Sequence, residues 1–411
     1  MKRPHAEGRI RVLAVDHTAG IAPFRKKFAA LAAHPEIDLT VVAPNRWVEN
    51  YREVRTLPGG DEGFRFAIGR VGWPGYENRA FFLSGLGAAI RRSRPQILHL
   101  WEEPYSVISL QAMWHAALWA REAQLVFSSA DNMSGSFHYA YRPSWFYAAV
   151  ERLAQRRCAA GTAITEEVAE TLRRKGFSKP IEIVPLALDL AAYPGSPEIG
   201  EADLARRASP AATLNRFGLP SPIVGYVGRL LPVKGVDLLL RAVAALPAPR
   251  PSLVIVGEGP ERYALETMAS DLGIGATTRF LPLVAHEDVP ALLSSIDVLV
   301  LPSRTTPRQK EQFGRVLIEG MAAGCVVIGS SSGGIPHVLG DAGLVFPEEN
   351  WSALATEIRR AIDDSELARE RRVRGRRRVR ERYTWDAVAA ELLGFYRRLL
   401  GRAPGSEIAA P

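Results

Sequence analysis

The sequence is organised around one stretch, Lys310-Glu311-Gln312-Phe313-Gly314-Arg315-Val316-Leu317-Ile318-Glu319-Gly320-Met321-Ala322-Ala323-Gly324. A carboxylate precedes a glycine, and the apolar spacing after that glycine predicts a helix that carries a second carboxylate. Backbone N–H groups at the start of such a helix form a site for a diphosphate. Glu311 and Glu319 then suit hydroxyl groups, because ionised carboxylates offer only acceptors. Taken alone, the stretch fits a capped surface helix with a solvated glutamate equally well.

Composition places the chain among ordinary globular proteins of two or three domains. It has 411 residues, of which 47% are hydrophobic and 23% are charged, as is usual for soluble proteins. The formal net charge of +8 and the pI near 9.6 favour anionic partners, such as nucleotide sugars, acidic lipid headgroups or nucleic acid. Much of this charge lies between Arg371 and Arg380, for which a solvated helix face is the default interpretation.

The cysteines and the apolar segments exclude several classes of protein. Cys158 and Cys325 are far apart and have no partner at metal-ligand spacing, so neither a disulfide framework nor a zinc site is indicated. The N-terminus has charge without an apolar segment behind it, and no run approaches about 18 apolar residues. We therefore expect a cytoplasmic protein that does not span a membrane but can lie peripherally on the inner face of the cytoplasmic membrane.

Strands alternate with helices in the first half of the chain, which predicts a doubly wound α/β domain. The loop after its first strand contains His17 and Gly20, at the carboxyl end of a strand, where ligands bind in such folds. One helix is expected at Phe81–Arg92. The expected strands are Ile10–Asp16, Leu39–Pro44, Gln96–Leu100, Leu125–Ser129, Gly161–Ile164 and Ile181–Leu186.

Two further segments of this domain carry candidate binding groups. Trp101-Glu102-Glu103-Pro104-Tyr105 follows an expected strand, and its acids and aromatic rings suit an acceptor pocket. A helix N-cap region with Pro104 in its first turn explains the same residues. The aromatic and basic residues of Phe137–Arg157 suit a membrane interface, and a partly buried helix accounts for them as well.

A segment rich in Pro, Gly and Ala follows, and then a second alternation of strands and helices begins. We predict a first domain at 1–194, a linker at 195–215, a second doubly wound domain at 216–384 and a C-terminal helix at 385–401 that packs back on the first domain. Two such domains form a cleft between them, where binding sites are common. The second domain's expected strands are Ile223–Gly228, Leu253–Gly257, Thr278–Leu283, Asp297–Pro302 and Val326–Gly329.

Two cations stand just past the first strand of the second domain. Arg229 and Lys234 lie on a loop with proline and glycine, where they can neutralise a leaving diphosphate. Such a pair of cations usually just solvates a loop. The order of motifs along the chain is what strengthens the interpretation as a diphosphate site. These motifs are Gly228-Arg229-Leu230, Lys234-Gly235, Gly257-Glu258-Gly259-Pro260, Leu301-Pro302-Ser303, Glu311-x7-Glu319 and Gly333-Gly334-Ile335-Pro336.

This series resembles the family 4 (group 1) glycosyltransferases, which retain the anomeric configuration and have the GT-B fold of two Rossmann-like domains facing across a cleft. The resemblance covers the second domain closely and the first mainly through its layout. It implies transfer of a sugar from a UDP- or GDP-linked donor to a glycan or lipid-linked acceptor in cell-surface polysaccharide or glycolipid biosynthesis. The first domain would bind the acceptor, and the second would bind the nucleotide sugar.

The family pattern implies roles for residues of this sequence. Arg229 and Lys234 would stabilise the donor diphosphate as the glycosidic bond breaks. Glu311 would hold hydroxyls of the donor sugar and Glu319 those of the ribose. Two cations and a helix N-terminus can neutralise the diphosphate, so neither a metal nor another cofactor is implied. The remaining donor-binding candidates are Gly20, Gly228, Glu258, Val284, Phe313, Gly314, Arg315, Val316 and Leu317.

The first domain departs from the family pattern in two places. Many members have a glycine pair in the first loop, where this chain has only Gly20 after Ala19. Many also have a histidine after the strand that is followed here by Asp131 and Asn132. In a front-face retaining mechanism the leaving phosphate can take the acceptor's proton, so no protein base is strictly required. The acceptor-side candidates are His17, Glu103, Asp131 and Asn132.

Three other interpretations stay open at this stage. The same fold could support a sugar-nucleotide epimerase or a phosphorylase. The missing histidine leaves room for a catalytically silent scaffold that binds a nucleotide sugar. Nucleic-acid binding rests only on the charge of Arg371–Arg380, and we do not expect it.

Overall fold

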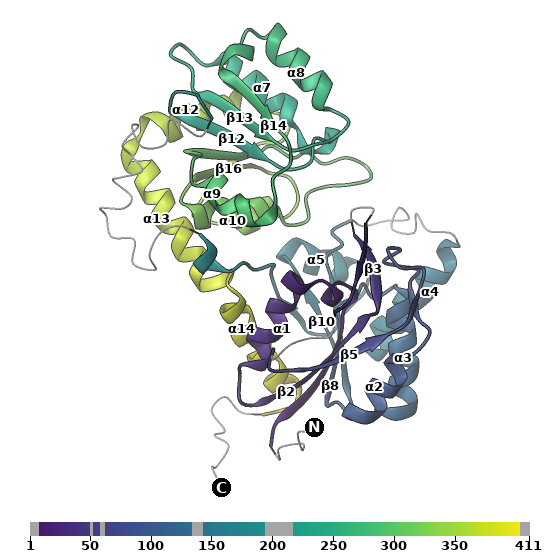
Figure 1. Cartoon of the computed structure of the whole chain (residues 1–411). Helices are drawn as coiled ribbons and strands as arrows, with labels where there is room; N and C mark the ends of the chain where they lie inside the picture. Colours follow the sequence, from purple (N-terminus) through teal and green to yellow (C-terminus); the bar gives the residue numbers. More distant parts are fainter. Residues whose placement is uncertain (1–7, 50–51, 58–61, 134–142, 194–216, 403–411) are drawn as a thin grey trace. The chain divides into compact units, whose positions relative to one another are not determined.

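Parallel pairing of buried apolar strands builds each of the two units into which the chain folds (Figure 1). Unit 1 contains Met1–Pro185 and Trp385–Pro411, and unit 2 contains Leu186–Thr384. The computed structural model describes residues 8–49, 52–57, 62–133, 143–193 and 217–402.

Unit 1 is built on a seven-stranded parallel sheet in the order β11-β10-β9-β8-β1-β2-β5. Its central strands are rich in fully buried valine, leucine and isoleucine, because helices cover both faces of the sheet. The strands are β1 (Ile10–Val15), β2 (Ile37–Pro44), β5 (Arg65–Gly69), β8 (Ile97–Leu100), β9 (Gln124–Ser129), β10 (Ala160–Ala163) and β11 (Ile181–Ile183).

Helices from both ends of the sequence complete unit 1. Helices α2, α3 and α4 pack beside one another, and the C-terminal helix α14 packs against α1 (Figure 1). Arg398 of α14 pairs with Glu182 of β11 at 2.6 Å. The helices are α1 (Lys26–Ala32), α2 (Leu86–Ser93), α3 (Val107–Trp119), α4 (Ser144–Arg157), α5 (Glu166–Arg174) and α14 (Trp385–Leu399).

The helix predicted at Phe81–Arg92 is wrong over its first part. Phe81–Phe82 forms a short strand, β7, that pairs antiparallel with β6 (Val71–Gly72). Helix α2 then begins only after Gly85, whose φ of 94° stops a helix from running through it. β3 (Arg46–Glu49) and β4 (Arg52–Arg55) also pair antiparallel.

Unit 2 is built on a six-stranded parallel sheet in the order β14-β13-β12-β15-β16-β17. The predicted pair of doubly wound domains is therefore confirmed, and β17 is a strand that the sequence did not indicate. Its strands are β12 (Ile223–Val227), β13 (Ser252–Val256), β14 (Thr278–Leu281), β15 (Val298–Leu301), β16 (Val326–Ser330) and β17 (Leu344–Phe346). Its helices are α7 (Val236–Ala245), α8 (Arg262–Asp271), α9 (Val289–Leu293), α10 (Arg315–Ala323), α11 (Ile335–Leu339), α12 (Trp351–Asp363) and α13 (Ser365–Arg382).

The arginine-rich run lies on α13, and it is more than a solvated face. Arg378 donates from Nε to the carbonyl of Val338 at 2.8 Å and from its terminal nitrogen to the carbonyl of His337 at 2.7 Å. Arg376 is only 5% exposed. Part of the positive charge thus caps the end of α11 and packs unit 2, because carbonyls at a helix end lack partners within the helix.

The strand order places a topological switch point in each sheet. In unit 1 the chain runs outward from β1 through β2 on one side and from β8 through β9 on the other. In unit 2 the corresponding neighbours are β12 and β15. Ligands of open α/β sheets bind outside the carboxyl ends of the strands at such points.

The described residues include no helix that is both long enough and apolar enough to cross a membrane. The predicted linker at 195–215 and residues 137–142 of the predicted membrane segment lie outside the described residues. The packing of the chain divides it after Pro185, and α14 begins at Trp385.

We predict that α14 is part of the unit 1 core. Leu392→Ala should lower the free energy of unfolding by about 2–5 kcal/mol, because Leu392 is buried and the truncation leaves a cavity. Urea denaturation of the full chain measures this. Ala390→Gln, at an exposed position of the same helix, is the control. Equal midpoints for the two variants would contradict the assignment.

Candidate functional site

A lysine and a glutamate meet across the switch point of unit 2. Lys234 ends the loop after β12, and Glu311 lies on the loop after β15. Lys234 Nζ is 2.6 Å from Glu311 Oε2, and the Ser303 hydroxyl donates to the same oxygen at 2.9 Å. The two charged side chains are 18% and 11% exposed. A paired carboxylate and ammonium group therefore lie together at the carboxyl edge of the sheet.

Backbone and side-chain bonds tie the two loops together. Arg304 N donates to the carbonyl of Val233 at 2.8 Å, and its guanidinium makes two bonds to the Asp237 carboxylate at 2.8 and 2.9 Å. Gly334 N donates to the carbonyl of Glu311 at 3.0 Å. These contacts fix the position of Glu311 from both sides of the switch point.

Two glycines are required by the same geometry. Gly235 has φ 64°, and a Cβ there would lie 2.1 Å from the carbonyl oxygen of Pro302. Gly314 has φ 75° at the N-cap of α10, and a Cβ there would lie 2.7 Å from a methyl of Leu301. Any other residue would push the loops apart or strain the backbone.

Arg229 lies at the carboxyl end of β12 with its side chain exposed. Its carbonyl accepts a hydrogen bond from the Tyr226 hydroxyl at 2.8 Å. Burial raises the pKa of Tyr226, and the nearby charge of Glu311 raises it further. Leu230 N donates to the carbonyl of Glu258 at 2.8 Å. Arg229 is therefore held by its backbone, and its guanidinium is available to a ligand.

Helix α10 begins just after the glycine, as the sequence predicts. Phe313 is buried, and its ring meets that of Tyr383 edge-on with centroids 5.9 Å apart. Leu317 is buried and Val316 is half-buried. Because these side chains anchor the first turn, its backbone N–H groups hold a defined position.

A second ion pair lies within α10. Arg315 Nε donates to Glu319 Oε1 at 3.1 Å. Burial raises the pKa of Glu319 above its usual value, and the charge of Arg315 partly offsets that effect. The hydroxyl of Tyr193 also lies within the field of this pair. Glu311 and Glu319 thus each have a cation of their own.

The other predicted donor residues lie at several places in the two units. Gly228 directly follows β12, and Glu258 pairs with Arg262 at 2.9 Å. Val284 follows β14 and is half-buried. Gly20 belongs to unit 1, where it is buried in the turn after β1.

Two of the predicted acceptor-side residues, Asp131 and Asn132, follow β9. Asp131 Oδ2 is 3.4 Å from Lys175 Nζ, and the Asn132 side-chain nitrogen donates to Glu167 at 3.0 Å. Both side chains are therefore engaged by residues of α5 or just after it. His138, the nearest histidine, lies outside the described residues.

His17 pairs with Glu102 across the switch point of unit 1. His17 Nδ1 lies 2.9 Å from both carboxylate oxygens, and the backbone N of His17 donates to Glu102 at 2.9 Å. Asp16 pairs with Lys27 at 2.5 Å. Asp16, His17 and Glu102 have ligand-type atoms within 4.8 Å of one another. The ammonium and the imidazole already occupy these carboxylates, so we describe a hydrogen-bonded network and assign no metal to it.

Sequence reasoning did not assign roles to several of these side chains. Ser303 belongs to the Leu301-Pro302-Ser303 motif, and Glu102 is one of the two acids after β8. Their contacts with Glu311 and His17 can be known only once the strand order is known. Tyr226, Arg304 and Lys27 carry no signal in the sequence that separates them from ordinary strand or loop residues.

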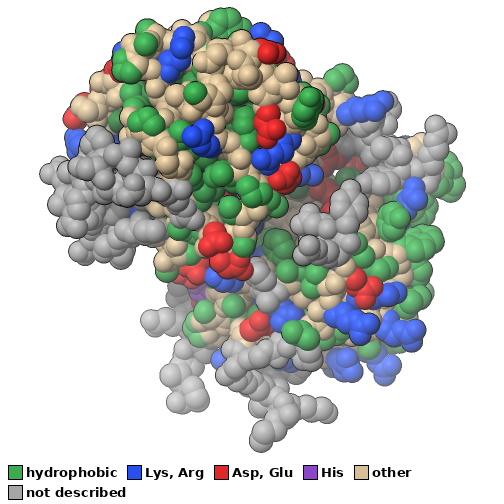
Figure 2. Space-filling model, turned by 45° about the horizontal axis from the view of Figure 1, so that its top comes forward, with side chains coloured by type: hydrophobic (Ala, Val, Ile, Leu, Met, Phe, Trp, Pro, Cys, Tyr) green, Lys and Arg blue, Asp and Glu red, His purple; other side chains and the backbone are tan. Residues whose placement is uncertain are grey.

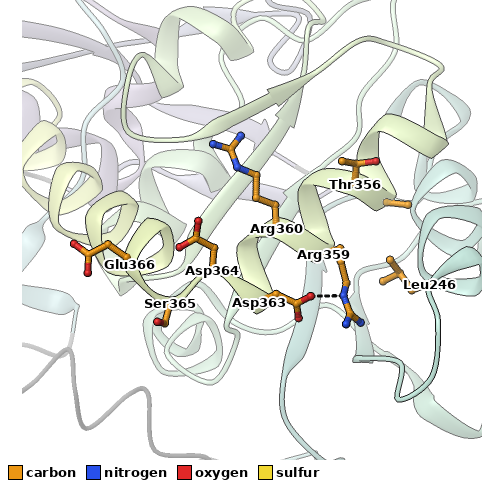
Figure 3. Close-up of a pocket in the computed structure, with 9 residues that line it drawn as sticks. Leu246, Thr356, Arg359, Arg360, Asp363, Asp364, Ser365 and Glu366 are labelled. Atoms are coloured by element: carbon orange, nitrogen blue, oxygen red, sulfur yellow. Dashed lines mark ion pairs between the residues drawn. The ribbon is translucent and has the colours of Figure 1, made fainter.

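The structure also contains a hollow of about 840 Å³ between α12, the start of α13 and the end of α7 (Figure 3). In Figure 3, Arg359 and Asp363 point toward one another and form an ion pair. None of the candidate residues lines this hollow, and its mixed charges favour no particular ligand. Its lining is Leu246, Ala355, Thr356, Arg359, Arg360, Asp363, Asp364, Ser365 and Glu366.

Two family models match the chain. The model described as glycosyl transferases group 1 matches residues 215–378, and the glycosyl transferase 4-like domain matches residues 19–187. The first match contains Lys234 and Glu311, and the second contains Glu102 and begins two residues after His17. The chain therefore belongs to the group 1 glycosyltransferases, as the series of motifs predicted.

Curated relatives are similar over part of their length. The chain is 30% identical to the 2-deoxystreptamine glucosyltransferase of Streptomyces kanamyceticus, over 62% of this chain and 64% of that protein. It is 31% identical to the D-inositol 3-phosphate glycosyltransferase of Salinispora arenicola, over 53% and 49%. It is 29% identical to a GDP-mannose-dependent phosphatidylinositol monomannoside mannosyltransferase of Mycolicibacterium smegmatis, over 62% and 67%. The chain thus spans about half to two thirds of these relatives.

Solved structures share the whole fold. Sucrose-phosphate synthase from Thermosynechococcus elongatus matches with a TM-score of 0.68 and 22% identity, over 96% of this chain and 100% of that one. Anabaena HepE in complex with UDP and glucose matches with a TM-score of 0.63 and 18% identity, over 95% and 100%. These likenesses, with the two parallel sheets, establish the GT-B fold.

We predict that Glu103 makes stability depend on pH. It accepts bonds from Ser129 and from the backbone N of Ala130, and burial together with the charge of Asp131 raises its pKa to about 8. A carboxyl whose pKa is raised by folding stabilises the fold below about pH 4.5 and loses that contribution as the pH rises through about 8. Between pH 5 and pH 8.5 the free energy of unfolding should fall by about 2–4 kcal/mol more in the wild type than in Glu103→Gln.

Urea denaturation at several pH values measures this difference. Glu170→Gln, at an exposed position of α5, is the matched control and should follow the wild type. Parallel pH curves for Glu103→Gln and the wild type would show that Glu103 does not titrate in this way.

Proposed function

We propose that the chain is a retaining, metal-independent glycosyltransferase that moves a sugar from a UDP- or GDP-linked donor to a hydroxyl of a glycan or lipid-linked acceptor. The observation that carries this proposal is the group formed by Lys234, Glu311 and Ser303 at the switch point of unit 2, beside the start of α10. A cation, a carboxylate and free backbone N–H groups match a diphosphate bonded to a sugar.

Each part of the donor has a counterpart in unit 2. Lys234 and Arg229 neutralise the diphosphate, together with the N–H groups of the first turn of α10. Glu311 accepts from hydroxyls of the transferred sugar. Glu319 accepts from the ribose hydroxyls, and Val284 lies against the base.

The reaction breaks the bond between the anomeric carbon and the diphosphate oxygen and forms a bond from that carbon to the acceptor oxygen. The leaving diphosphate keeps the electron pair of the broken bond, and Arg229 and Lys234 stabilise its growing charge. The acceptor's proton passes to the leaving phosphate oxygen. Attack on the face from which the diphosphate leaves retains the anomeric configuration.

The names of the relatives favour a polyol acceptor. They are consistent with either a UDP-linked or a GDP-linked donor. Their names include 2-deoxystreptamine, D-inositol 3-phosphate and phosphatidylinositol monomannoside. Anabaena HepE binds UDP, and the mannosyltransferase relative uses GDP-mannose. We infer a role in the synthesis of cell-surface polysaccharide or glycolipid at the cytoplasmic side of the membrane.

We predict that Glu311→Gln lowers turnover by about 10²–10⁴-fold, because the sugar loses a charged hydrogen-bond acceptor that is fixed for the transition state. Binding of UDP or GDP alone should change only a few-fold. Mass detection of the transferred sugar measures turnover, with UDP-glucose, UDP-N-acetylglucosamine and GDP-mannose as donors and membrane extract as the acceptor source. Thermal shift measures nucleotide binding.

Asp271→Asn, at an exposed site in unit 2, is the control and should behave as the wild type. Lys234→Met combined with Glu311→Gln should cost about as much as the worse single variant, because the two side chains form one pair. Donor binding without turnover in the wild type would favour a silent scaffold. Glu311-independent turnover would contradict the proposed role of the carboxylate.

An aromatic surface of unit 1 supports peripheral binding to a membrane. Trp114, Leu118 and Trp119 of α3 are exposed, and the guanidinium of Arg91 lies 5.2 Å from the ring centre of Trp119. Figure 2 shows hydrophobic and basic side chains side by side on one face of unit 1. Aromatic rings with adjacent cations suit the interface of an anionic bilayer. On α4, part of the segment first predicted for this role, Trp145 is exposed.

We predict that Trp114→Ala with Trp119→Ala weakens binding to vesicles of phosphatidylglycerol by about tenfold or more. Cosedimentation with vesicles of defined composition measures the change. Trp351→Ala, which removes an exposed tryptophan of unit 2, is the control. Equal binding by the double variant and the control would show that this surface does not contact the membrane.

A further inference from the structure

The network at the switch point of unit 1 has the geometry of a binding site. Strands β1 and β8 are neighbours there, and the sheet continues outward from each in opposite directions. His17 follows β1 and Glu102 follows β8. Their contact therefore spans the crevice in which open α/β sheets bind ligands.

The imidazole of His17 is fixed through one nitrogen only. Nδ1 lies 2.9 Å from both oxygens of Glu102, and the Trp47 ring lies 4.6 Å away, centroid to centroid. Among the described residues, none makes a hydrogen bond to Nε2 of His17. This nitrogen is also not one of the buried polar atoms that lack a partner. The side chain stays 13% exposed. Nε2 is thus oriented by its surroundings and reachable by a ligand.

The charges around His17 keep it protonated. Burial alone lowers the pKa of His17, but the charge and hydrogen bond of Glu102, followed by the charges of Asp16 and Glu77, raise it to about 9. Lys27 of α1 lies against Asp16 and balances that carboxylate. At neutral pH both ring nitrogens therefore carry hydrogen, and Nε2 donates.

The same charges indicate what kind of oxygen His17 would contact. Three carboxylates, on Asp16, Glu77 and Glu102, surround two cations, on His17 and Lys27. The cluster has no excess of positive charge to favour a phosphate or carboxylate. An uncharged hydroxyl accepts a hydrogen bond from the imidazolium without adding charge to the cluster.

We propose that His17 Nε2–H binds a hydroxyl oxygen of a polyol acceptor and that Glu102 is the positioning residue that orients and charges the imidazole. The role of this site in binding the acceptor rests on the proposed function. In this role His17 donates a hydrogen bond and does not abstract a proton. The acceptor's proton then goes to the leaving diphosphate, because the protonated imidazole cannot take it.

NMR of the full chain with ¹³C-labelled histidine tests this proposal, and the signal lost in His17→Gln identifies His17. In the wild type His17 should titrate near pH 9, and Glu102→Gln should move its midpoint toward 6.5. At pH 7, myo-inositol as the probe should shift the His17 signal saturably. In Glu102→Gln, the affinity for myo-inositol should fall by about tenfold between pH 6 and pH 8 as the ring loses its charge.

Glu122→Gln, an exposed glutamate of the same unit, is the control and should leave the midpoint unchanged. A midpoint near 6.5 in the wild type, or a His17 signal that does not respond to myo-inositol, would overturn the proposal. Binding of D-inositol 3-phosphate through His17 more than about tenfold tighter than myo-inositol would overturn the choice of an uncharged hydroxyl. Thermal shift with UDP-glucose and GDP-mannose reports on donor binding and not on His17, so a failure of the proposed function shows separately.

Discussion

The hydrogen-bonded ion pair between Lys234 and Glu311 is the interaction on which the unit 2 site depends. Taking two charges partly out of water costs free energy, and their attraction offsets that cost only when further bonds satisfy them. Ser303 supplies such a bond, and the loop contacts of Arg304 keep the partners in register. A pair held in this way contributes little net stability. Its position at a strand edge is better explained by a ligand that takes the place of one partner.

That ligand has complementary charges. A diphosphate can draw the ammonium away from the carboxylate, and a sugar hydroxyl can then donate to the carboxylate that is left. On α10, Glu319 is paired with Arg315, and in this proposal its carboxylate also accepts from the ribose hydroxyls. In the structure the candidate carboxylates Glu311 and Glu319 are thus each neutralised by a cation, Lys234 and Arg315.

Unit 1 repeats the arrangement with different chemistry. His17 and Glu102 also join the loops after two neighbouring strands at a switch point. An imidazolium held through Nδ1 presents a single directed donor, whereas an ammonium presents three rotatable ones. The first suits one hydroxyl of an acceptor and the second suits the several oxygens of a diphosphate. In this proposal the two units use the same position in the fold for different substrates.

Apolar runs and loop glycines predicted most of the fold, because buried parallel strands must be apolar and tight turns need glycine. Strand order was beyond the sequence, so the partnership of His17 with Glu102 could not be foreseen even though both residues were noted. Phe81 and Phe82 resembled the start of a helix because an isolated pair of apolar residues fits the apolar spacing of a helix as well as that of a strand. Arg378 looked solvated because its acceptors, the carbonyls at the end of α11, leave no trace in the sequence.

The central claim is that the carboxyl ends of β12 and β15 bind a nucleotide sugar. A crystal structure of the chain with UDP-glucose or GDP-mannose tests it most directly. The account predicts the diphosphate at Lys234 and the first turn of α10, with hydroxyls of the sugar on Glu311 and of the ribose on Glu319. A nucleotide bound elsewhere, with the Lys234 and Glu311 pair intact, would contradict it.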